Sequence, residues 1–387
     1  MSHAYPNTHP WIKFALDLRE FPYELWLLLG EISSKCEHLA GTPLRPDVAD
    51  QLHRLYLAKG VLATSAIEGN TLSEEEVLAH FEGKLKLPPS KAYLQLEITN
   101  VHNACNKVIN DLITNGVSDL TPGVIKEYNR IILEGLSLED HVVPGEIRKE
   151  SVVVGRYRGC EAVECEHLLS KLCSWLAEIQ AGSKDLLLPM AVIKAVLAHV
   201  YLAWIHPFGD GNGRTARLLE FHVLFGSGVP TPAVHLLSNF YNETRAEYYR
   251  QLDSASRSGG DLVPFFRYAL TGFRDALAAQ IEVVREHQRQ AAWVNYVHEK
   301  FRGLTSPSDI RRRRLVLAFS DKGEVSRAQI PNISTEIYQL YSGKGAKTLT
   351  RDINSLVTMG LAEKTPRGVR VRTELIQAFL PLRTNND

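Results

Sequence analysis

The chain has 387 residues, of which 44% are hydrophobic and 23% are charged, and its formal net charge is zero. This length and apolar content predict two or three domains with hydrophobic cores, and a neutral chain has no overall attraction to nucleic acid or acidic membranes. The chain lacks an uninterrupted run of about eighteen apolar residues and the basic and apolar stretches of a leader, so we expect neither a membrane span nor a signal peptide.

Cysteine usage indicates a reducing compartment. The cysteines are odd in number and include no Cys-x-x-Cys pair, whereas a disulfide framework or a zinc site is expected to show paired spacings. We therefore expect free thiols and a cytoplasmic protein. The five positions are Cys36, Cys105, Cys160, Cys165 and Cys173.

Residues 50–68 carry apolar side chains near helical spacing and predict a helix. Gly69 suits the C-terminal cap of that helix, and Ser73 with Glu76 forms a capping-box pattern for the next one. Glu68 then stands in a last helical turn, where the helix dipole disfavours an acid by about 0.3–1 kcal/mol. This placement hints at a role for Glu68, and a solvated surface glutamate is the alternative.

Residues 143–148 read as a turn, and residues 151–157 read as a short strand followed by a turn. The two segments together predict a small β-hairpin. Taken alone, the pattern is that of an ordinary two-stranded hairpin.

Residues 188–205 form a long apolar stretch that predicts a buried helix. Pro207 disfavours helical geometry at His206, so we expect the helix to stop there. An imidazole held at a rigid helix end can act as a general base near neutral pH.

The residues after Pro207 predict an anion site. Three alternating glycines, at 209, 211 and 213, allow successive N–H groups to line one concave surface, and a helix beginning near Arg214 adds positive charge to it. Arg214 and Arg217 share a helix face and can both bind phosphate oxygens. Asp210 would be repelled by a phosphate unless Mg²⁺ bridges them. The spacing matches neither a dinucleotide fingerprint nor a Walker A loop.

Residues 307–387 have a different character, with more basic than acidic residues although the whole chain is neutral. Helices are predicted over 311–319, after Ser334 and over 346–359, followed by a hairpin over 361–372. This order resembles a winged helix-turn-helix. The third helix could read DNA through Thr348, Thr350, Arg351 and Asn354, while the alternative is a protein-docking or dimerising module with a solvated charged face. Residues 311–314 are all arginines that would circle the first helix, which is poor geometry for a single DNA-facing stripe.

The segment 206–217 resembles the signature of the Fic family, His-Pro-Phe-x-x-Gly-Asn-Gly-Arg-x-x-Arg. Every fixed position of the signature is met, at His206, Pro207, Phe208, Gly211, Asn212, Gly213, Arg214 and Arg217. The resemblance implies transfer of AMP from ATP to a Ser, Thr or Tyr hydroxyl of a target protein or of the chain itself. A kinase-like branch of the family carries lysine where this chain has Gly213, so the glycine favours nucleotidyl transfer.

The resemblance also implies a role for each residue of the loop. His206 would deprotonate the target hydroxyl, and Asp210 would hold Mg²⁺ on the α- and β-phosphates. The nucleotide would be bound by Gly211, Asn212, Gly213, Arg214 and Arg217, with the two arginines on the β- and γ-phosphates.

An inhibitory motif of the family, Ser/Thr-x-x-x-Glu-Gly/Asn, is matched at Thr64, Glu68 and Gly69. In the family this glutamate pairs with the second arginine of the signature, here Arg217, and prevents the γ-phosphate from docking correctly. The resemblance therefore implies that the free enzyme restrains itself through Glu68 and Arg217.

Two further segments follow the family pattern. The predicted hairpin corresponds to a flap that covers the nucleotide, here through Val154 and Gly155, and aligns the target. Residues 159–162 depart from the prolines that many relatives carry, which leaves the shape of the flap and the target open. Residues 238–252 resemble a segment whose tyrosines border adenine; of Tyr248 and Tyr249 we expect one, assigned to Tyr248, at the base and the other in the core.

The expected fold is mainly α: a Fic helical core with a small β-hairpin flap, an N-terminal helical region and a C-terminal winged helix-turn-helix. The expected domains are 1–90 with the inhibitory helix, 91–280 as the core, 281–306 as a linker helix and 307–387 as the winged part. A different class of function, a nucleotide-responsive DNA-binding regulator, stays open, as do removal of AMP at the same site and a homodimer. The expected partners are ATP and a target protein, with DNA or protein at the C-terminal part and no membrane.

Overall fold

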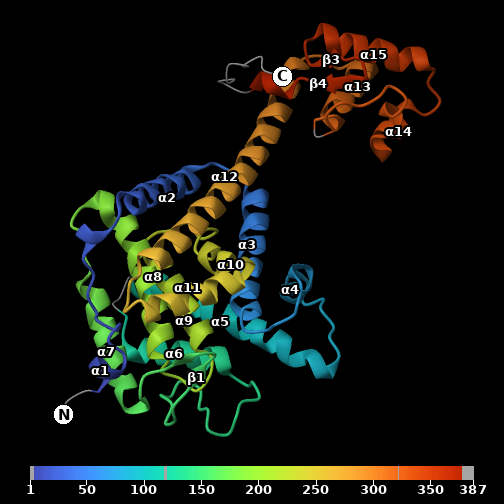
Figure 1. Ribbon diagram of the computed structural model, residues 1–387. Coiled ribbons are helices and arrows are strands. Elements are labelled where there is room, and N and C mark those ends of the chain that lie inside the picture. The colour runs from blue at the N-terminus through green and yellow to red at the C-terminus, as the bar shows by residue number, and fades with distance from the viewer. Residues whose placement is uncertain (1–3, 117–119, 321, 377–387) are drawn as a thin grey trace. The chain divides into compact units, whose positions relative to one another are not determined.

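The structure is a computed structural model that describes residues 4–116, 120–320 and 322–376, apart from the side chain of Val154. The described chain is mainly helical with two small hairpins, as the sequence predicted. It divides into two compact units, Met1–Ile281 and Glu282–Asp387, and the boundary falls within a single long helix (Figure 1).

The first unit contains eleven complete α-helices, a two-stranded hairpin and the first part of α12 among the described residues. The helices and strands are α1 (Tyr5–Thr8), α2 (Tyr23–Gly41), α3 (Pro46–Ala66), α4 (Glu74–Phe81), α5 (Ala92–Asn115), α6 (Pro122–Leu133), β1 (Val153–Val154), β2 (Tyr157–Arg158), α7 (Ala162–Glu178), α8 (Leu187–Ile205), α9 (Asn212–Gly226), α10 (Leu236–Glu243), α11 (Arg245–Arg257) and α12 (Val263–Lys300). Short 3₁₀ turns cover Leu18–Glu20, Pro89–Lys91 and Lys184–Leu186.

Helix α8 is the centre of this unit. It is apolar on all sides and is packed between α2, α7 and α9, so most of its side chains are buried (Figure 1). With residues 184–186 it is also long and apolar enough to cross a membrane by length and composition. The sequence expectation concerned an uninterrupted apolar run, and Lys194 and His199 interrupt this one. In this unit the segment is a core helix.

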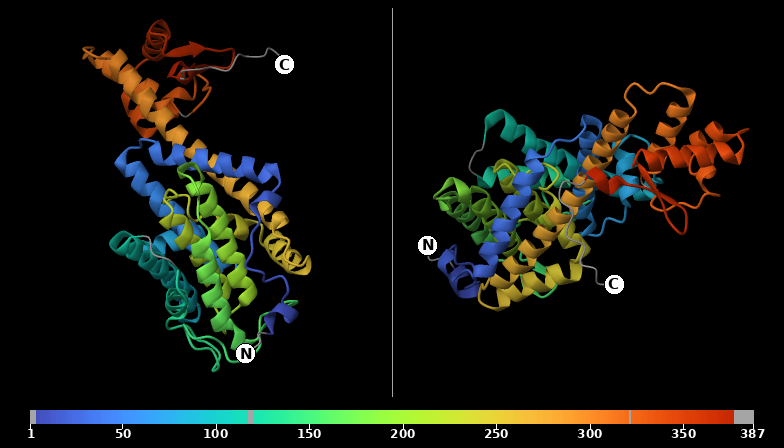
Figure 2. Two further views of the ribbon diagram at one scale, coloured as in Figure 1. Left: turned by 90° about the vertical axis from the view of Figure 1, so that its left-hand side faces the viewer. Right: turned by 90° about the horizontal axis from the view of Figure 1, so that it is seen from above.

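Two helices bring residues 64–69 and residues 206–217 together. Helix α9 packs on α8 and α5, while α3 packs on α10 and also contacts α9. Gly60 allows the close approach of α3, since a Cβ at this position would overlap the ring of His235. The end of α3 therefore lies beside the start of α9, although the two segments are far apart in the sequence (Figures 1 and 2).

Residues near the N-terminus share the hydrophobic core of residues 91–280. Ile12, Phe14 and Leu25 are buried in the same cluster as the side chains of α8 and α9. The main-chain N–H of Ala4 donates to Glu164 on α7 at 2.7 Å. All five cysteines are buried, and none forms a disulfide.

The second unit has its own core, built on Trp293 and Val297 from the end of α12 and on Phe301 directly after it. Its other elements are α13 (Pro307–Ala318), α14 (Thr335–Tyr341), α15 (Ala346–Thr358), β3 (Ala362–Lys364) and β4 (Val369–Val371), with 3₁₀ turns at Ile330–Asn332 and Thr373–Ile376. The predicted order of three short helices and a hairpin is thus present, while the winged-helix class stays a prediction.

The arginines of α13 do not simply circle a solvated helix. Arg311 and Arg312 both donate to the buried carboxylate of Asp352 on α15, with Nε–Oδ distances of 2.6 and 3.0 Å. Tyr341 donates to the same carboxylate at 2.8 Å. These contacts join α13, α14 and α15. They also pair Arg311 and Arg312 with a carboxylate, so these two arginines do not add free positive charge to the surface of the unit.

Candidate active site

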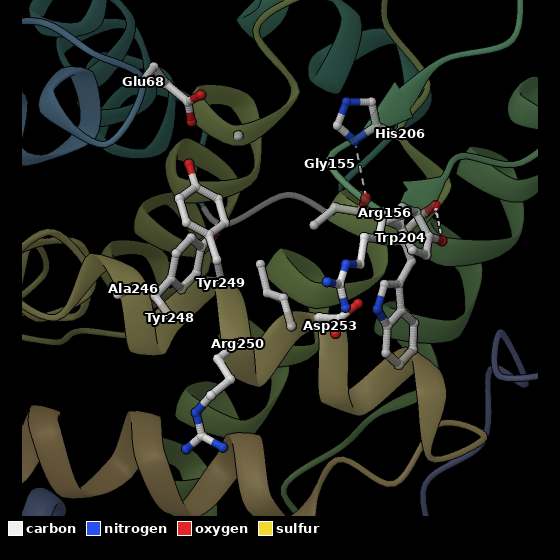
Figure 3. Close-up of a pocket in the computed structure, with 14 residues that line it drawn as sticks. Glu68, Gly155, Arg156, Trp204, His206, Ala246, Tyr248, Tyr249, Arg250 and Asp253 are labelled. Atoms are coloured by element: carbon white, nitrogen blue, oxygen red, sulfur yellow. Dashed lines mark hydrogen bonds between the residues drawn. The ribbon is translucent and has the colours of Figure 1, made fainter.

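His206 ends α8 in the left-handed conformation, with φ 52° and ψ 58°, directly before Pro207. Its Nδ1 lies 3.2 Å from the carbonyl oxygen of Ala203 (Figure 3). A carbonyl only accepts, so Nδ1 carries the proton in the neutral ring and Nε2 keeps a free lone pair. The imidazole is thus arranged to accept a proton at Nε2.

The pKa of His206 is lowered. Burial is the largest cause, and the guanidinium of Arg148 acts in the same direction. The carbonyl of Ala203 and the carboxylates of Glu68 and Asp210 act against this without reversing it. The neutral ring that can act as a base is therefore favoured at neutral pH.

The loop after His206 has a fixed shape. Gly211 takes φ 75° at the N-cap of α9, a conformation that favours glycine. The side chain of Asn212 forms two hydrogen bonds to the main chain of Phe208 in the loop. Its Oδ1 accepts from the N–H of Phe208 at 2.9 Å, and its Nδ2 donates to the carbonyl of Phe208 at 2.8 Å. Helix α9 starts at Asn212, two residues before the predicted start at Arg214. The side chain of Asn212, expected on a phosphate, here holds the loop.

The two arginines of α9 are both buried. Arg214 contacts Asp210 at 3.3 Å and Glu97 at 3.6 Å. Arg217 donates through Nη2 to the carbonyl of Thr64 at 2.9 Å and to Glu68 at 2.5 Å. Within the described chain, Nε of Arg214 and both Nε and Nη1 of Arg217 have no hydrogen-bond partner. Buried guanidinium donors without acceptors are suited to an anionic ligand.

Glu68 already places one anion at the start of α9. Its carboxylate lies against Gly213, where a Cβ would overlap it, and it is paired with Arg217. Burial raises the pKa of Glu68, but the attraction and hydrogen bond of Arg217, together with the charges of Arg214 and His206, leave the pKa below its usual value. Glu68 lies in the turn after α3 and not in the last helical turn as predicted.

Asp210 is partly exposed beside these groups. Its Oδ1 accepts from the N–H of Gly211 at 2.5 Å and faces Arg214. The described residues contain no cluster of three or more His, Cys, Asp or Glu side chains that could hold a metal. A single carboxylate suits Mg²⁺, which is commonly held by one protein carboxylate together with substrate phosphates.

A pocket of about 630 Å³ opens beside His206 and Glu68 (Figure 3). Tyr249 projects toward Glu68 from α11, and its hydroxyl lies 3.3 Å from the carbonyl of Ile67. Tyr248 is 2% exposed, and its hydroxyl lies 2.9 Å from Nε2 of His199. Both tyrosines line the pocket, but the more accessible ring is that of Tyr249 rather than the predicted Tyr248.

The predicted flap is present as the antiparallel pair β1 and β2, with Gly155 and Arg156 in the turn. Gly155 lines the pocket, whereas the side chain of Val154 lies outside the described residues. Arg148, just before the flap, was not predicted as a site residue. It is buried, and its Nε donates to the carbonyl of His206 at 2.8 Å.

Comparisons with known proteins find relatives in one family. Residues 119–224 match the Fic/DOC family. Protein adenylyltransferase fic-1 of Caenorhabditis elegans is 33% identical over 208 residues, which cover 54% of this chain and 38% of that protein. Protein adenylyltransferase Fic of Nematostella vectensis is 30% identical over 241 residues, which cover 62% of this chain and 52% of that protein.

Solved structures show the same fold. Fic-1 of C. elegans (residues 134–508) matches with a TM-score of 0.58 and 26% identity, covering 68% of this chain and 74% of that one. A Fic family protein from Desulfovibrio desulfuricans G20 matches with a TM-score of 0.54 and 21% identity, covering 90% and 95%. Residues 206–217, within the matched segment, meet every fixed position of the signature of that family. It spans about half or less of the length of these two curated relatives.

Proposed function

We propose that this chain is a protein adenylyltransferase that moves AMP from ATP to a hydroxyl of a target protein or of itself. The observation that carries the proposal is that His206 and Gly213 line the same pocket, at the start of a helix that also carries two buried arginines. The names of the curated relatives support the same reaction.

In the proposed reaction the triphosphate of ATP lies on the N-terminus of α9 and its base lies in the pocket beside Tyr249. Nε2 of His206 takes the proton of the incoming hydroxyl. The hydroxyl oxygen forms a bond to the α-phosphorus, the bond from that phosphorus to the α,β-bridging oxygen breaks, and pyrophosphate leaves. Asp210 would hold Mg²⁺, which when bound neutralises charge on the phosphates.

Glu68 restrains this reaction in the proposed scheme. Its carboxylate lies where the start of α9 and Arg217 would receive phosphate oxygens. Two anions cannot share this site without strong repulsion, so ATP must bind elsewhere in the pocket or displace Glu68. The free protein is therefore expected to be largely inactive.

The test is mass spectrometry of the protein after incubation with ATP and Mg²⁺. Glu68→Gly should gain an AMP adduct on a Ser, Thr or Tyr side chain, and Glu68→Gly/His206→Ala should not. An absent adduct in Glu68→Gly, with ATP binding intact, would favour a nucleotide sensor instead. Removal of AMP at the same site is distinguished by incubating the adduct with wild-type protein and following its loss.

A second proposal concerns the second unit, which we infer binds DNA. Lys347, Arg351 and Asn354 are exposed on α15 at helical spacing, and Lys364 and Arg367 are exposed on the hairpin. The arginines at 311 and 312 are engaged with Asp352 and are not part of this surface.

Fluorescence anisotropy with a mixed-sequence duplex tests this second proposal. Lys347→Glu/Arg351→Glu should abolish binding, and binding to the wild type should weaken steeply with salt. Arg327→Glu, an exposed position on neither α15 nor the hairpin, is the matched control. Equal binding by the α15 variant and the control would instead favour a protein-docking or dimerising module.

A further inference from the structure

Arg148 is a buried cation without an acidic partner. It is 5% exposed, and none of the ion pairs in the described part of the chain involves it. Burying an unpaired charge is costly unless hydrogen bonds compensate it. Its guanidinium is compensated by main-chain carbonyls alone.

Those carbonyls come from three different places. Nε donates to His206 at 2.8 Å, Nη1 donates to Glu150 at 2.6 Å, and Nη2 donates to Cys160. The main-chain N–H of Arg148 also donates to the carbonyl of Pro207 at 3.0 Å. Glu150 precedes β1 and Cys160 follows β2, so one side chain joins both ends of the flap hairpin to the catalytic loop.

The contact to His206 bears on a strained residue. A residue other than glycine in the left-handed region costs roughly 1–2 kcal/mol and persists only where its surroundings fix it. Arg148 binds the carbonyl of His206. Gly159 leaves room for this contact, because a Cβ added at Gly159 would lie 3.1 Å from Nη2 of Arg148 and 3.2 Å from Cβ of His206.

The charge of Arg148 adds a second effect. The charged groups that face His206 are Arg148, Glu68 and Asp210. Arg148 lowers the pKa of the imidazole, and the two carboxylates raise it. Arg148 is therefore the one cation among these groups that favours the neutral base.

We propose that Arg148 is a positioning residue for AMP transfer, which holds the main chain of His206 and both ends of the flap hairpin in one fixed arrangement. This inference rests on the proposed function for its kinetic test. It assigns the coupling of flap and catalytic loop to a residue outside the signature. Lysine cannot make the three-way contact, because its ammonium lacks the planar fork of arginine.

The kinetic test compares variants in a Glu68→Gly background. Arg148→Ala should lower kcat for self-modification about a hundredfold, the effect of misplacing a reacting group by about 1 Å, while the Kd for ATP from calorimetry changes less than about threefold. Arg148→Lys should recover part of kcat, and millimolar guanidinium ion should rescue Arg148→Ala. The control, Arg158→Ala, removes an exposed arginine of the same hairpin whose side chain makes no hydrogen bond or ion pair in the described structure.

Hydrogen exchange supplies a readout independent of activity. In Arg148→Ala, the amides of residues 150–160 and those of His206 and Phe208 should exchange faster together, and they should be unchanged in Arg158→Ala. If Arg148→Ala does not fold, exchange in the same two segments is compared between Arg148→Lys and Arg158→Ala. An unchanged kcat, unchanged exchange in the two segments, or a loss of kcat that neither lysine nor guanidinium restores would overturn the proposal. Absent transfer in the Glu68→Gly parent would instead contradict the proposed function and leave the exchange test valid.

Discussion

The carboxylate of Glu68 lies 2.5 Å from Nη2 of Arg217, and it also covers Gly213 at the start of α9. Arg217 is 1% exposed, so this contact is shielded from solvent on the side of the arginine. A second donor bond from the same nitrogen to the carbonyl of Thr64 fixes the arginine against the end of α3. The proposed anion site thus already contains an anion supplied by the chain.

Removal of that carboxylate should raise the rate of the proposed transfer reaction. Glu68→Gly is expected to raise the rate of self-modification at least about tenfold, which corresponds to 1.4 kcal/mol of activation free energy. The measurement is incorporation of α-labelled phosphate from ATP. Glu82→Gly, which removes an exposed carboxylate paired with Lys84, serves as the control and should leave the rate unchanged. A Glu68→Gly protein no faster than this control would argue against self-restraint.

The same pair predicts how stability depends on pH. Arg217, with smaller contributions from Arg214 and His206, holds the pKa of Glu68 below its usual value in the folded protein. The contribution of the pair is then fully present above the unfolded-state pKa and is lost as pH falls through the folded pKa. The free energy of unfolding from urea titrations should therefore fall more steeply below pH 4.5 in the wild type than in Glu68→Gln. Parallel curves for the two proteins would show that the pair does not stabilise the fold.

The base assignment predicts a pH profile of transfer. Because the pKa of His206 is lowered, the rate in Glu68→Gly should stay constant through neutral pH and fall only below the usual histidine value of 6.5. Removal of Glu68 also removes a group that raises this pKa, so the acid limb moves further down. His206→Ala should lose about 10²–10⁴-fold in kcat with ATP binding retained. An acid limb centred above 6.5 would contradict the assignment.

The two adjacent tyrosines should respond differently to mutation. Tyr249→Ala is expected to raise the KM for ATP, because the variant loses the stacking of the base, which contributes roughly 1–3 kcal/mol of binding free energy. Tyr248→Phe should cost about 1 kcal/mol of stability by deleting the hydrogen bond to His199, with little change in KM. Steady-state kinetics and thermal unfolding of both variants separate these effects. A raised KM in Tyr248→Phe with an unchanged KM in Tyr249→Ala would instead place Tyr248 at the adenine base.

The buried carboxylate of Asp352 should be essential to the second unit. Asp352→Ala leaves Arg311 and Arg312 without their shared acceptor and should destabilise the unit by about 3–5 kcal/mol. Hydrogen exchange of the α15 amides measures this locally. Glu336→Ala, which removes an exposed partner of Arg314, should cost less than about 1 kcal/mol. Similar effects of the two substitutions would show that burial of Asp352 adds nothing.

Local features of the site could be read from the sequence. Pro207 stops α8 at His206, as predicted, and the capping box of Ser73 and Glu76 forms as its spacing indicated. The pairing of Glu68 with Arg217 was implied by the family motifs and is observed in the structure. Each of these follows from residues within a few positions or from a motif with fixed spacing.

Other features depend on tertiary contacts that spacing does not reveal. The role of Arg148 arises from carbonyls at 150, 160 and 206, which no side-chain pattern marks. The two faces of α11 decide that Tyr249 rather than Tyr248 is accessible. Likewise, Asp352 looked like one acid in a basic segment, and only the packing of α13 on α15 shows that it binds two arginines.

The most direct test of the account is a crystal structure of Glu68→Gly/His206→Ala soaked with ATP and Mg²⁺, since this variant should bind ATP without consuming it. We predict that the triphosphate lies on the amides at the start of α9 with its outer phosphates at Arg214 and Arg217. The α-phosphorus should face the space that Nε2 of His206 occupies in the wild type. A triphosphate bound elsewhere, or a loop that stays free of nucleotide at saturating ATP, would contradict the account.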